Sequence, residues 1–374
     1  MATSWTVNRS RERIETLFRS GGEDHELRAA ALAEMRRTLG FSAYAWPLSD
    51  PETATGVAPM AQVPEDVAAR LPQLIKAKYT SPVNRWTALS TAPSPVATLA
   101  GTTGGALSRR GPFEGMLRSY GVGDIVSVVY ADQYGIWSWL DLWRGSDDPP
   151  FSDAETGFLA SLAPAITTGF RRSRAAQFRS YDDERHTPPP PPQAVLVMDE
   201  EMRVLGQTAS AEQWLGLLQR SPGPNSAIPA EVYNVVGQLL AKEYRVDVHA
   251  AAARVHIGGG QWAALRAARM DSPDSTGTPV ASPPVAVTIQ ECPPAARLGV
   301  FVRSYGLTAR ERQALALLAA GLENEQLARR MGIAGYTAQD HFKSIFVKTG
   351  VHSRSGVLAL ALGGNARDDA AFLP

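Results

Sequence analysis

The chain has 374 residues, with 37 basic (Lys, Arg) and 37 acidic (Asp, Glu) side chains. At about 100 to 200 residues per domain, this length predicts two or three domains. The hydrophobic content of 44% excludes a globally disordered chain. A lone cysteine, Cys292, excludes an internal disulfide framework and a cysteine-rich zinc site, which favours a cytoplasmic protein.

The N-terminus has the wrong composition for a signal peptide. Arg9, Arg11, Glu12 and Arg13 occupy the segment where an apolar core would be required. Nowhere do about 18 uncharged apolar residues follow one another, as a membrane-spanning helix would need. We therefore expect no membrane partner.

Residues 1–187 alternate helix and strand signals. The predicted elements are helices over 26–39 and 65–79, a strand over 41–48, and a hairpin of strands 125–130 and 136–143. Ser152 and Glu155 form a capping box that opens a further helix reaching Phe170. This order predicts an α+β domain with helices packed on an antiparallel sheet.

Five consecutive prolines, residues 188–192, separate this region from the next. Such a run favours an extended conformation and predicts a semi-rigid linker. Residues 193–291 then show two strands, helices and three strands. The strands are predicted over 194–198, 203–205, 255–257, 261–269 and 285–289, and the helices over 209–218 and 229–241. This order resembles that of PAS-type sensor domains.

Residues 300–365 carry eight basic and four acidic side chains, a net charge of +4 in a chain whose total formal charge is zero. Thr308 and Glu311 form a second capping box, and Gly321 ends the helix that follows. Asn324 is expected to cap a short helix, and a longer one over 336–348 is stopped by Gly350. Two helices joined by a glycine-containing turn predict a helix-turn-helix, whose second helix enters the major groove of DNA.

The helical period assigns two faces to this second helix. Ala338, Phe342, Ile345 and Thr349 are predicted to face the core, which places four other side chains on the opposite face: Gln339, Asp340, Lys343 and Val347. Gln pairs with adenine, Asp accepts from cytosine, and Lys bonds guanine or phosphate. Lys348 and Arg354, near the end of the helix, are predicted to contact phosphates.

The C-terminal sequence resembles the LuxR-type helix-turn-helix. The matching positions are Leu307-Thr308-x-Arg310-Glu311, Gly321-Leu322-x-Asn324-x-x-Leu327-Ala328, Gly332-Ile333, Thr337, His341, Ile345, Lys348, Gly350-Val351 and Arg354. The resemblance implies a four-helix domain whose third helix, with Thr337 among its DNA contacts, reads the major groove. It also implies that the fourth helix, about residues 353–362, pairs in a dimer.

Three residues depart from the family pattern, and one of them is Thr349, which replaces a usual core Leu. Ala334 replaces the usual Ser or Thr before the recognition helix, which removes an N-cap worth about 1 kcal/mol. Asp340 adds a negative charge to the predicted DNA face. It either lowers the affinity for DNA or sharpens a preference for cytosine, and both interpretations remain open.

The N-terminal half resembles GAF-like sensor domains at residues 135–142, at the helix start 151–155 and at Pro164. Trp137, Trp139, Asp141 and Trp143 share one face of a predicted strand and could line a ligand pocket. Further candidates for the same pocket are Trp46, Trp86, Tyr120 and Tyr130. The alternative is that these aromatic side chains only pack in the core.

The predicted fold is therefore a multidomain α+β chain: GAF-like and PAS-like antiparallel-sheet domains at 1–187 and 193–291, then an all-α LuxR-type domain at 300–365. We predict a ligand-responsive transcriptional regulator that binds double-stranded promoter DNA as a homodimer and senses an unknown small-molecule effector. No cofactor, metal site or enzymatic activity is predicted, because no catalytic motif is present. The alternative is a protein-interaction sensor module whose C-terminal domain mainly dimerises.

Overall fold

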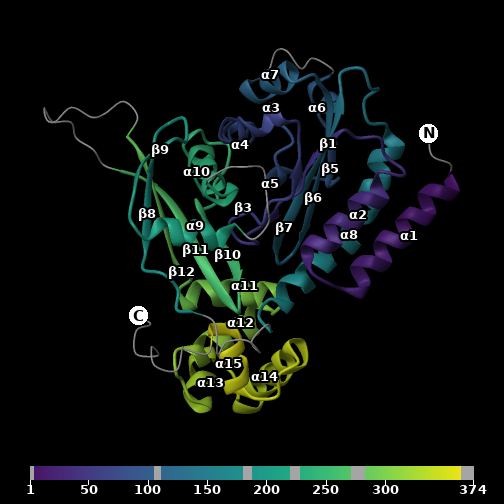
Figure 1. The fold of residues 1–374 in the computed structure, drawn as a ribbon. Helices are drawn as coiled ribbons and strands as arrows, with labels where there is room; N and C mark the ends of the chain where they lie inside the picture. Colours follow the sequence, from purple (N-terminus) through teal and green to yellow (C-terminus); the bar gives the residue numbers. More distant parts are fainter. Residues whose placement is uncertain (1–3, 105–110, 180–187, 220–227, 271–282, 364–374) are drawn as a thin grey trace, which may run out of the picture.

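The computed structural model describes residues 4–104, 111–179, 188–219, 228–270 and 283–363. Two antiparallel sheets lie next to each other, and a C-terminal group of helices lies below them in Figure 1. Antiparallel sheets in the N-terminal region followed by a helical C-terminal domain agree with the predicted order of α+β and all-α parts. No helix in the described part of the chain has both the length and the apolar character needed to cross a bilayer.

The first sheet is organised around one long hairpin. Its described strands are β1 (Ala43–Ala45), β2 (Leu48–Ser49), β3 (Gly56–Val57), β4 (Ala61–Gln62), β5 (Val96–Thr98), β6 (Val122–Asp132) and β7 (Gly135–Gly145). Strand β7 pairs with β6 along one edge and with β1 and β2 along the other. The predicted hairpin is confirmed, and Asp132 and Gly135 close it as partners.

Proline explains two differences from the predicted elements. The strand expected over 41–48 is split into β1 and β2, and Pro47, which has no N–H for a ladder hydrogen bond, lies in the break. The helix expected over 65–79 is split into α3 (Glu65–Ala68) and α4 (Leu71–Thr80). Pro72 fits the first turn of α4 but would clash within a continuous helix.

Helices cover both faces of the first sheet. α1 (Ser4–Ser20), α2 (Asp24–Met35) and α8 (Asp153–Ala176) lie on one side, with Phe170 of α8 against Tyr130 at a ring-centre distance of 5.9 Å. The capping box of Ser152 and Glu155 is confirmed at the start of α8. On the other side lie α4, α5 (Trp86–Leu89), α6 (Leu99–Thr103) and α7 (Pro112–Ser119).

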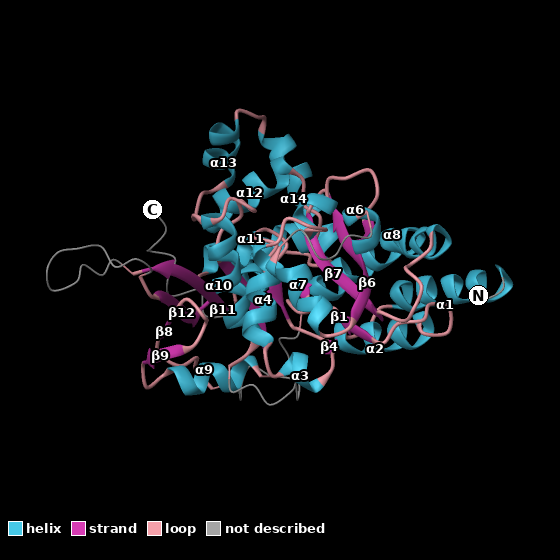
Figure 2. Ribbon diagram, turned by 90° about the horizontal axis from the view of Figure 1, so that it is seen from above, coloured by secondary structure: helices cyan, strands magenta, loops and turns pink. Residues whose placement is uncertain are grey.

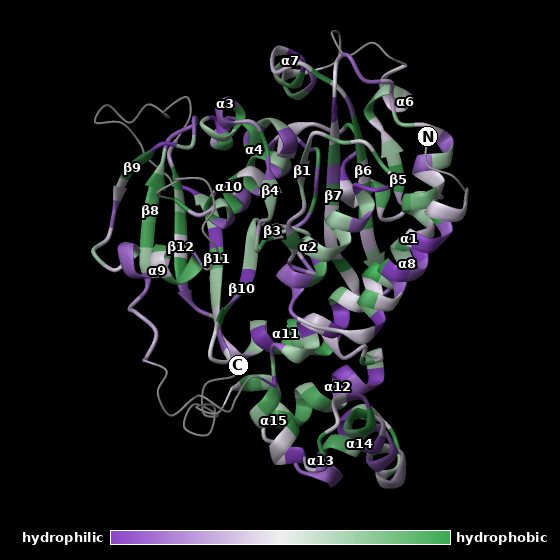
Figure 3. Ribbon diagram, turned by 45° about the vertical axis from the view of Figure 1, so that its right-hand side comes forward, coloured by the Kyte–Doolittle hydropathy of each residue, from purple (hydrophilic) through white to green (hydrophobic). Residues whose placement is uncertain are grey.

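The second sheet has the predicted order of elements along the chain. The strands are β8 (Ala194–Met198), β9 (Val204–Gln207), β10 (Ala252–Gly258), β11 (Gln261–Arg269) and β12 (Val285–Glu291), and the helices are α9 (Ala211–Leu218) and α10 (Ala230–Glu243). All pairings are antiparallel, in the spatial order β9-β8-β12-β11-β10. β8 and β12 are strongly hydrophobic in Figure 3, as expected for strands of a buried sheet.

The two sheets share one core. α10 and α4 pack against each other between the sheets, as the view from above shows (Figure 2). The two helices approach closely at Gly237, where an added Cβ atom would lie only 2.8 Å from the ring of Tyr79. Arg85 and Asp247 form an ion pair of 2.7 Å across the contact, and each side chain is only 1% exposed. The amide of Asn234 also donates to the Gly56 carbonyl.

The proline segment lies along the second sheet. Its first carbonyl, of Pro188, accepts a hydrogen bond from Gln261 of β11. Its last, of Pro192, accepts one from Trp214 of α9 at 2.9 Å. The segment predicted as a linker therefore connects two regions that are packed together.

The C-terminal helices are α11 (Pro294–Ser304), α12 (Ala309–Ala319), α13 (Asn324–Met331), α14 (Gly335–Thr349) and α15 (Arg354–Leu362). α11 crosses the boundary predicted at residue 300 and contacts α8, β10 and α15. The second predicted capping box, of Thr308 and Glu311, is confirmed. The expected Asn324 cap is wrong: Asn324 is the first helical residue, and Gln326 accepts a hydrogen bond from the Glu323 N–H instead.

We predict that the Arg85→Met substitution lowers the free energy of unfolding of both sheets. Removing one partner of a buried ion pair leaves the other charge without compensation, which costs about 3–5 kcal/mol. Because the sheets share a core, urea unfolding followed by tryptophan fluorescence and by circular dichroism should show one common transition at lower urea. Arg203→Met, which removes an exposed pair with Asp199, is the control and should leave the midpoint unchanged. Separate transitions for the two probes in the wild type would contradict the shared core.

Candidate DNA-binding interface

α14 has one buried and one exposed face. Ala338, Phe342, Ile345 and Thr349 are all 2% exposed or less, in a core shared with α12, α13 and α15. Gln339, Asp340, Lys343 and Val347 are exposed, and Val347 is 84% exposed. The side-chain directions predicted for these eight residues are confirmed. Thr337 is partly buried at the edge of the exposed face.

The exposed face contains a tyrosine that the sequence analysis missed. Tyr336 is 73% exposed at the start of α14. It precedes Asp340 by four residues, Lys343 by seven and Val347 by eleven, so these side chains form one stripe along the helix. The spacing from Asp340 would have been the signal to find it. The stripe offers an aromatic ring, an acid, a base and a methyl-bearing side chain.

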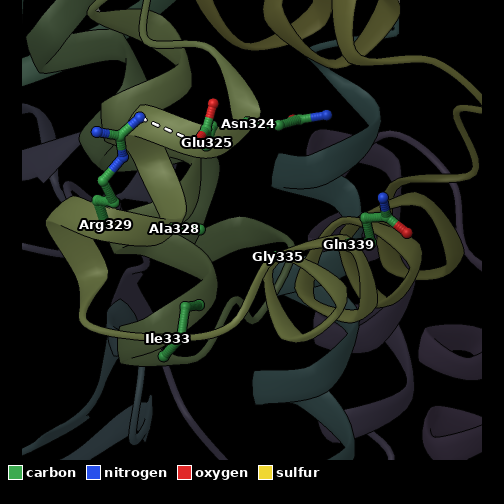
Figure 4. Close-up of a pocket in the computed structure, with 7 residues that line it drawn as sticks. All are labelled: Asn324, Glu325, Ala328, Arg329, Ile333, Gly335 and Gln339. Carbon is green, nitrogen blue, oxygen red and sulfur yellow. Dashed lines mark ion pairs between the residues drawn. The ribbon is translucent and has the colours of Figure 1, made fainter.

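A groove of about 580 Å³ lies between α13 and α14. The lining residues are Asn324, Glu325, Ala328, Arg329, Ile333, Gly335 and Gln339. In the view of Figure 4, the amides of Asn324 and Gln339 lie on one side of the groove and the Arg329–Glu325 ion pair, 3.0 Å long, on the other. Amide groups both donate and accept, so this rim of the groove can bond either a base edge or a phosphate.

The one basic residue of the stripe is held by its acidic neighbour. Lys343 Nζ lies 2.9 Å from Asp340 Oδ1, and the two side chains are 73% and 63% exposed. Such exposed pairs contribute less than about 1 kcal/mol, so a stronger anion can displace Asp340. The pair makes the exposed face locally neutral.

Lys348 and Arg354, predicted as phosphate contacts, have partners within the protein. Lys348 Nζ bonds Glu311 Oε2 at 2.7 Å and the Gly306 carbonyl at 3.2 Å. The Arg354 guanidinium stacks over the Phe342 ring at 4.2 Å, and burial lowers its pKa. Both side chains are partly buried and link α14 to its neighbours, Lys348 to α12 and Arg354 to α15.

Glu311 is the polar centre of this support. Burial would raise the pKa of Glu311, but hydrogen bonds from Lys348, Ser344 and the Thr308 N–H hold it below the ordinary value. The start of α14 has no comparable support. Ala334 occupies the N-cap position and makes no side-chain hydrogen bond, as expected for an alanine in place of the usual Ser or Thr.

The aromatic ligand candidates lie on opposite faces of the first sheet. Trp46 and Tyr130 pack on Phe170 of α8. Trp86 stacks on Trp139 at 4.1 Å on the other face, because Trp139 follows Ser138, the register partner of Tyr130. One common pocket for the whole set is therefore a wrong prediction: sequence alone did not fix the face to which Trp46 and Tyr130 point.

The remaining candidates are held by the core. Asp141 pairs with Lys78 at 2.8 Å and accepts from Ser127 at 2.6 Å. Trp137 donates to Asp132, while Trp143 and Tyr120 pack in a cluster beneath α7. Four buried polar atoms of the set have no hydrogen-bond partner in the described part of the chain: Trp46 Nε1, Tyr120 OH, Tyr130 OH and Trp143 Nε1. Core packing is thus combined with unsatisfied polar atoms on both faces.

Residues 306–361 match the family model of bacterial regulatory proteins, luxR family. The chain is 44% identical over 62 residues to the probable transcriptional regulatory protein SgaR of Hyphomicrobium methylovorum, covering 17% of this chain and 29% of that protein. It is 39% identical over 56 residues to the transcriptional regulatory protein MctR of Rhizobium johnstonii, covering 15% and 26%. The chain thus spans less than a third of either relative. The C-terminal unit is a LuxR-type helix-turn-helix domain.

Two solved structures resemble the chain weakly. Escherichia coli SdiA matches 94% of this chain and 96% of its own at 12% identity, with a TM-score of 0.35. The Vibrio cholera VqmA structure with ligand and DNA matches 49% and 85% at 21% identity, with a TM-score of 0.21. Scores this low define neither the fold nor the function of the N-terminal region.

We predict that Glu311→Gln lowers the free energy of unfolding by about 1–3 kcal/mol at neutral pH, the usual worth of hydrogen bonds to a charged group. Because the folded-state pKa of Glu311 is depressed, its stabilisation is complete above the ordinary carboxyl pKa and is lost as the pH falls through the folded-state value. Urea unfolding at pH 7 and pH 3 should show the wild-type advantage shrinking at the lower pH. Glu325→Gln, at an exposed pair, is the control and should show no such trend. An equal difference at both pH values would contradict the prediction.

Proposed function

We propose that the chain is a transcriptional regulator that reads double-stranded promoter DNA with α14. One observation carries this proposal: the stripe of Tyr336, Asp340, Lys343 and Val347 is exposed along a helix whose opposite face is fully buried. A LuxR-type domain with such an exposed stripe on its recognition helix is suited to enter the major groove.

Three exposed side chains of α14 have a base contact in this proposal. Gln339 bonds adenine, Lys343 bonds guanine or phosphate after leaving Asp340, and Val347 contacts a thymine methyl group. Thr337 lies at the edge of this contact. Lys348 and Arg354 act indirectly, by holding α14 in place. Exposed Arg329 at the rim of the groove takes over a phosphate contact.

The first test is selection of duplexes from a random-sequence pool by the full chain, followed by fluorescence anisotropy on the selected and on scrambled duplexes. Gln339→Ala should cost about 1–3 kcal/mol on the selected duplex and little on the scrambled one. Lys343→Ala should also reduce the salt slope by about one. Arg11→Ala, on the distant helix α1, is the control. Unchanged affinity in both α14 variants would refute the assignment of the DNA face.

Asp340→Asn separates the two interpretations of this acid. Removing the carboxylate releases Lys343 and lessens repulsion of phosphates, so affinity for scrambled DNA should rise about two- to fivefold, as expected for one exposed charge interaction. If Asp340 also reads cytosine, the variant should lose discrimination at a single position of the selected duplex. Anisotropy on duplexes altered one base pair at a time measures both effects. A fall in affinity for scrambled DNA would contradict the repulsive role.

We further propose that the N-terminal region is a small-molecule sensor, with a GAF-like domain at 1–187 and a PAS-like domain at 193–291 preceding the DNA-binding domain at 300–365. The proposal is supported by the second sheet's order of elements and by the buried polar atoms of Tyr120 and Trp143 beneath α7. Dimer formation through α15 is part of the proposal and rests on the family resemblance.

Thermal unfolding of the full chain against a library of small polar metabolites tests the sensor. A compound that raises the melting temperature should also change the anisotropy titration with the selected duplex. Trp143→Phe keeps the apolar ring and removes the indole N–H, so it should weaken the response to a compound bound beneath α7. Trp46→Phe, on the opposite face, is the matched control.

A further inference from the structure

The end of α8 caps the recognition helix. Arg179 lies just beyond α8, and its Nη2 donates to the main-chain carbonyl of Thr349, the last residue of α14, at 2.8 Å. The last carbonyls of a helix have no donor within the helix, and the negative end of the helix dipole attracts a cation. An arginine from the N-terminal region thus donates to a terminal carbonyl of the helix proposed to read DNA.

The residue after Thr349 makes room for this contact. Gly350 has a φ of +68°, the left-handed conformation that glycine adopts most easily. A Cβ atom at this position would lie 3.0 Å from Arg179 Nη2. Gly350 therefore both ends the helix and leaves space for the guanidinium group.

The segment that carries Arg179 is itself fixed on several sides. The hydroxyl of Tyr305 donates to the Ala175 carbonyl at 2.9 Å. Phe178 is fully buried, stacks on Trp262 of β11 at 4.9 Å and meets Phe301 of α11 edge-on at 5.3 Å. Arg179 consequently projects from a rigid junction of α8, the second sheet and α11.

Arg179 contacts the recognition helix at its C-terminal end. Lys348 ties the same end to the Gly306 carbonyl, whereas Tyr336 and Gln339 lie toward the other end and are exposed. Recognition helices contact bases chiefly through their N-terminal residues. An anchor at the C-terminal end sets the direction of α14 and leaves its exposed stripe uncovered.

We propose that Arg179 is a positioning residue for DNA recognition, which fixes the direction of α14 relative to the two sheets. This inference rests on the DNA-binding function proposed above. A pre-oriented helix loses less freedom on binding a specific site. Non-specific binding depends mainly on the number of phosphate contacts and tolerates many orientations. Loss of Arg179 should therefore affect specific binding selectively.

The test compares full-length Arg179→Ala, Arg179→Lys and Arg172→Ala. Arg172 is the matched control, because it also lies near the end of α8 but donates to the Arg19 carbonyl, away from α14. In anisotropy, Arg179→Ala should bind the selected duplex about fivefold more weakly, the upper range for a cation at a helix C-terminus. Its affinity for scrambled DNA should stay within about twofold of wild type. Arg179→Lys should restore binding, because a lysine can still donate to the carbonyl.

Hydrogen exchange gives a second readout that needs no DNA. Arg179→Ala should speed amide exchange in peptides covering residues 345–356, and Arg172→Ala should not. If the wild type selects no duplex, the regulatory function fails and hydrogen exchange alone decides the positioning role. Unchanged exchange together with an unchanged affinity ratio overturns the proposal. Equal losses of affinity on both duplexes would instead identify Arg179 as a direct phosphate contact. Tighter binding by Arg179→Ala would mean that Arg179 opposes DNA binding. Either result also overturns the proposal.

Discussion

The arrangement of this protein depends on arginines buried between its two sheets. Arg85 pairs with Asp247, and Arg254 pairs with Asp50 at 2.7 Å. Burial would raise the pKa of Asp50, yet Arg254 and nearby backbone N–H groups lower it to about 2. Separating the sheets would break these ion pairs, whose charges are already buried away from water. Moving one sheet relative to the other therefore has a large cost in free energy. Sheet contact is consequently a fixed feature from which the rest of the fold is built.

Hydrogen bonds to the second sheet hold the C-terminal helices in position. Arg254 also donates to the Ala296 carbonyl in α11, and Arg297 of α11 donates to the Gly260 carbonyl in the turn before β11. The core of α12–α15 continues through Phe301 to Phe178 and Trp262. A DNA-binding domain on a flexible tether would have a separate core. In this chain the core is continuous, so a change in packing at either sheet is transmitted to α14 through contacting side chains.

Features set by neighbouring residues could be predicted from the sequence, whereas contacts between residues far apart in the chain could not. The capping boxes at Ser152 and Thr308 identified helix starts because their partners lie three residues apart. The pairing of Arg85 with Asp247 joins residues 162 positions apart and has no local signature. Strands β3–β5 have two or three residues each, too few for a period, and no helix was predicted for α11, which begins at Pro294 directly after Pro293. Period two grouped Trp139 with Trp143 but could not place Trp46 on the opposite face.

The same limit applies to the charge of the DNA-binding region. Of its eight basic side chains, Arg303 donates to the Tyr134 carbonyl, Lys348 bonds Glu311 and Arg354 stacks on Phe342. Five exposed basic residues remain, against three exposed acids, so the solvent-facing surplus is +2 rather than the +4 of the sequence. With about 0.9 counterion released per phosphate contact, so few cations give modest non-specific binding. In the proposed function, specific affinity then comes from base contacts and from the direction of α14, so the proposed anchor at its C-terminal end matters more here than in a strongly basic domain.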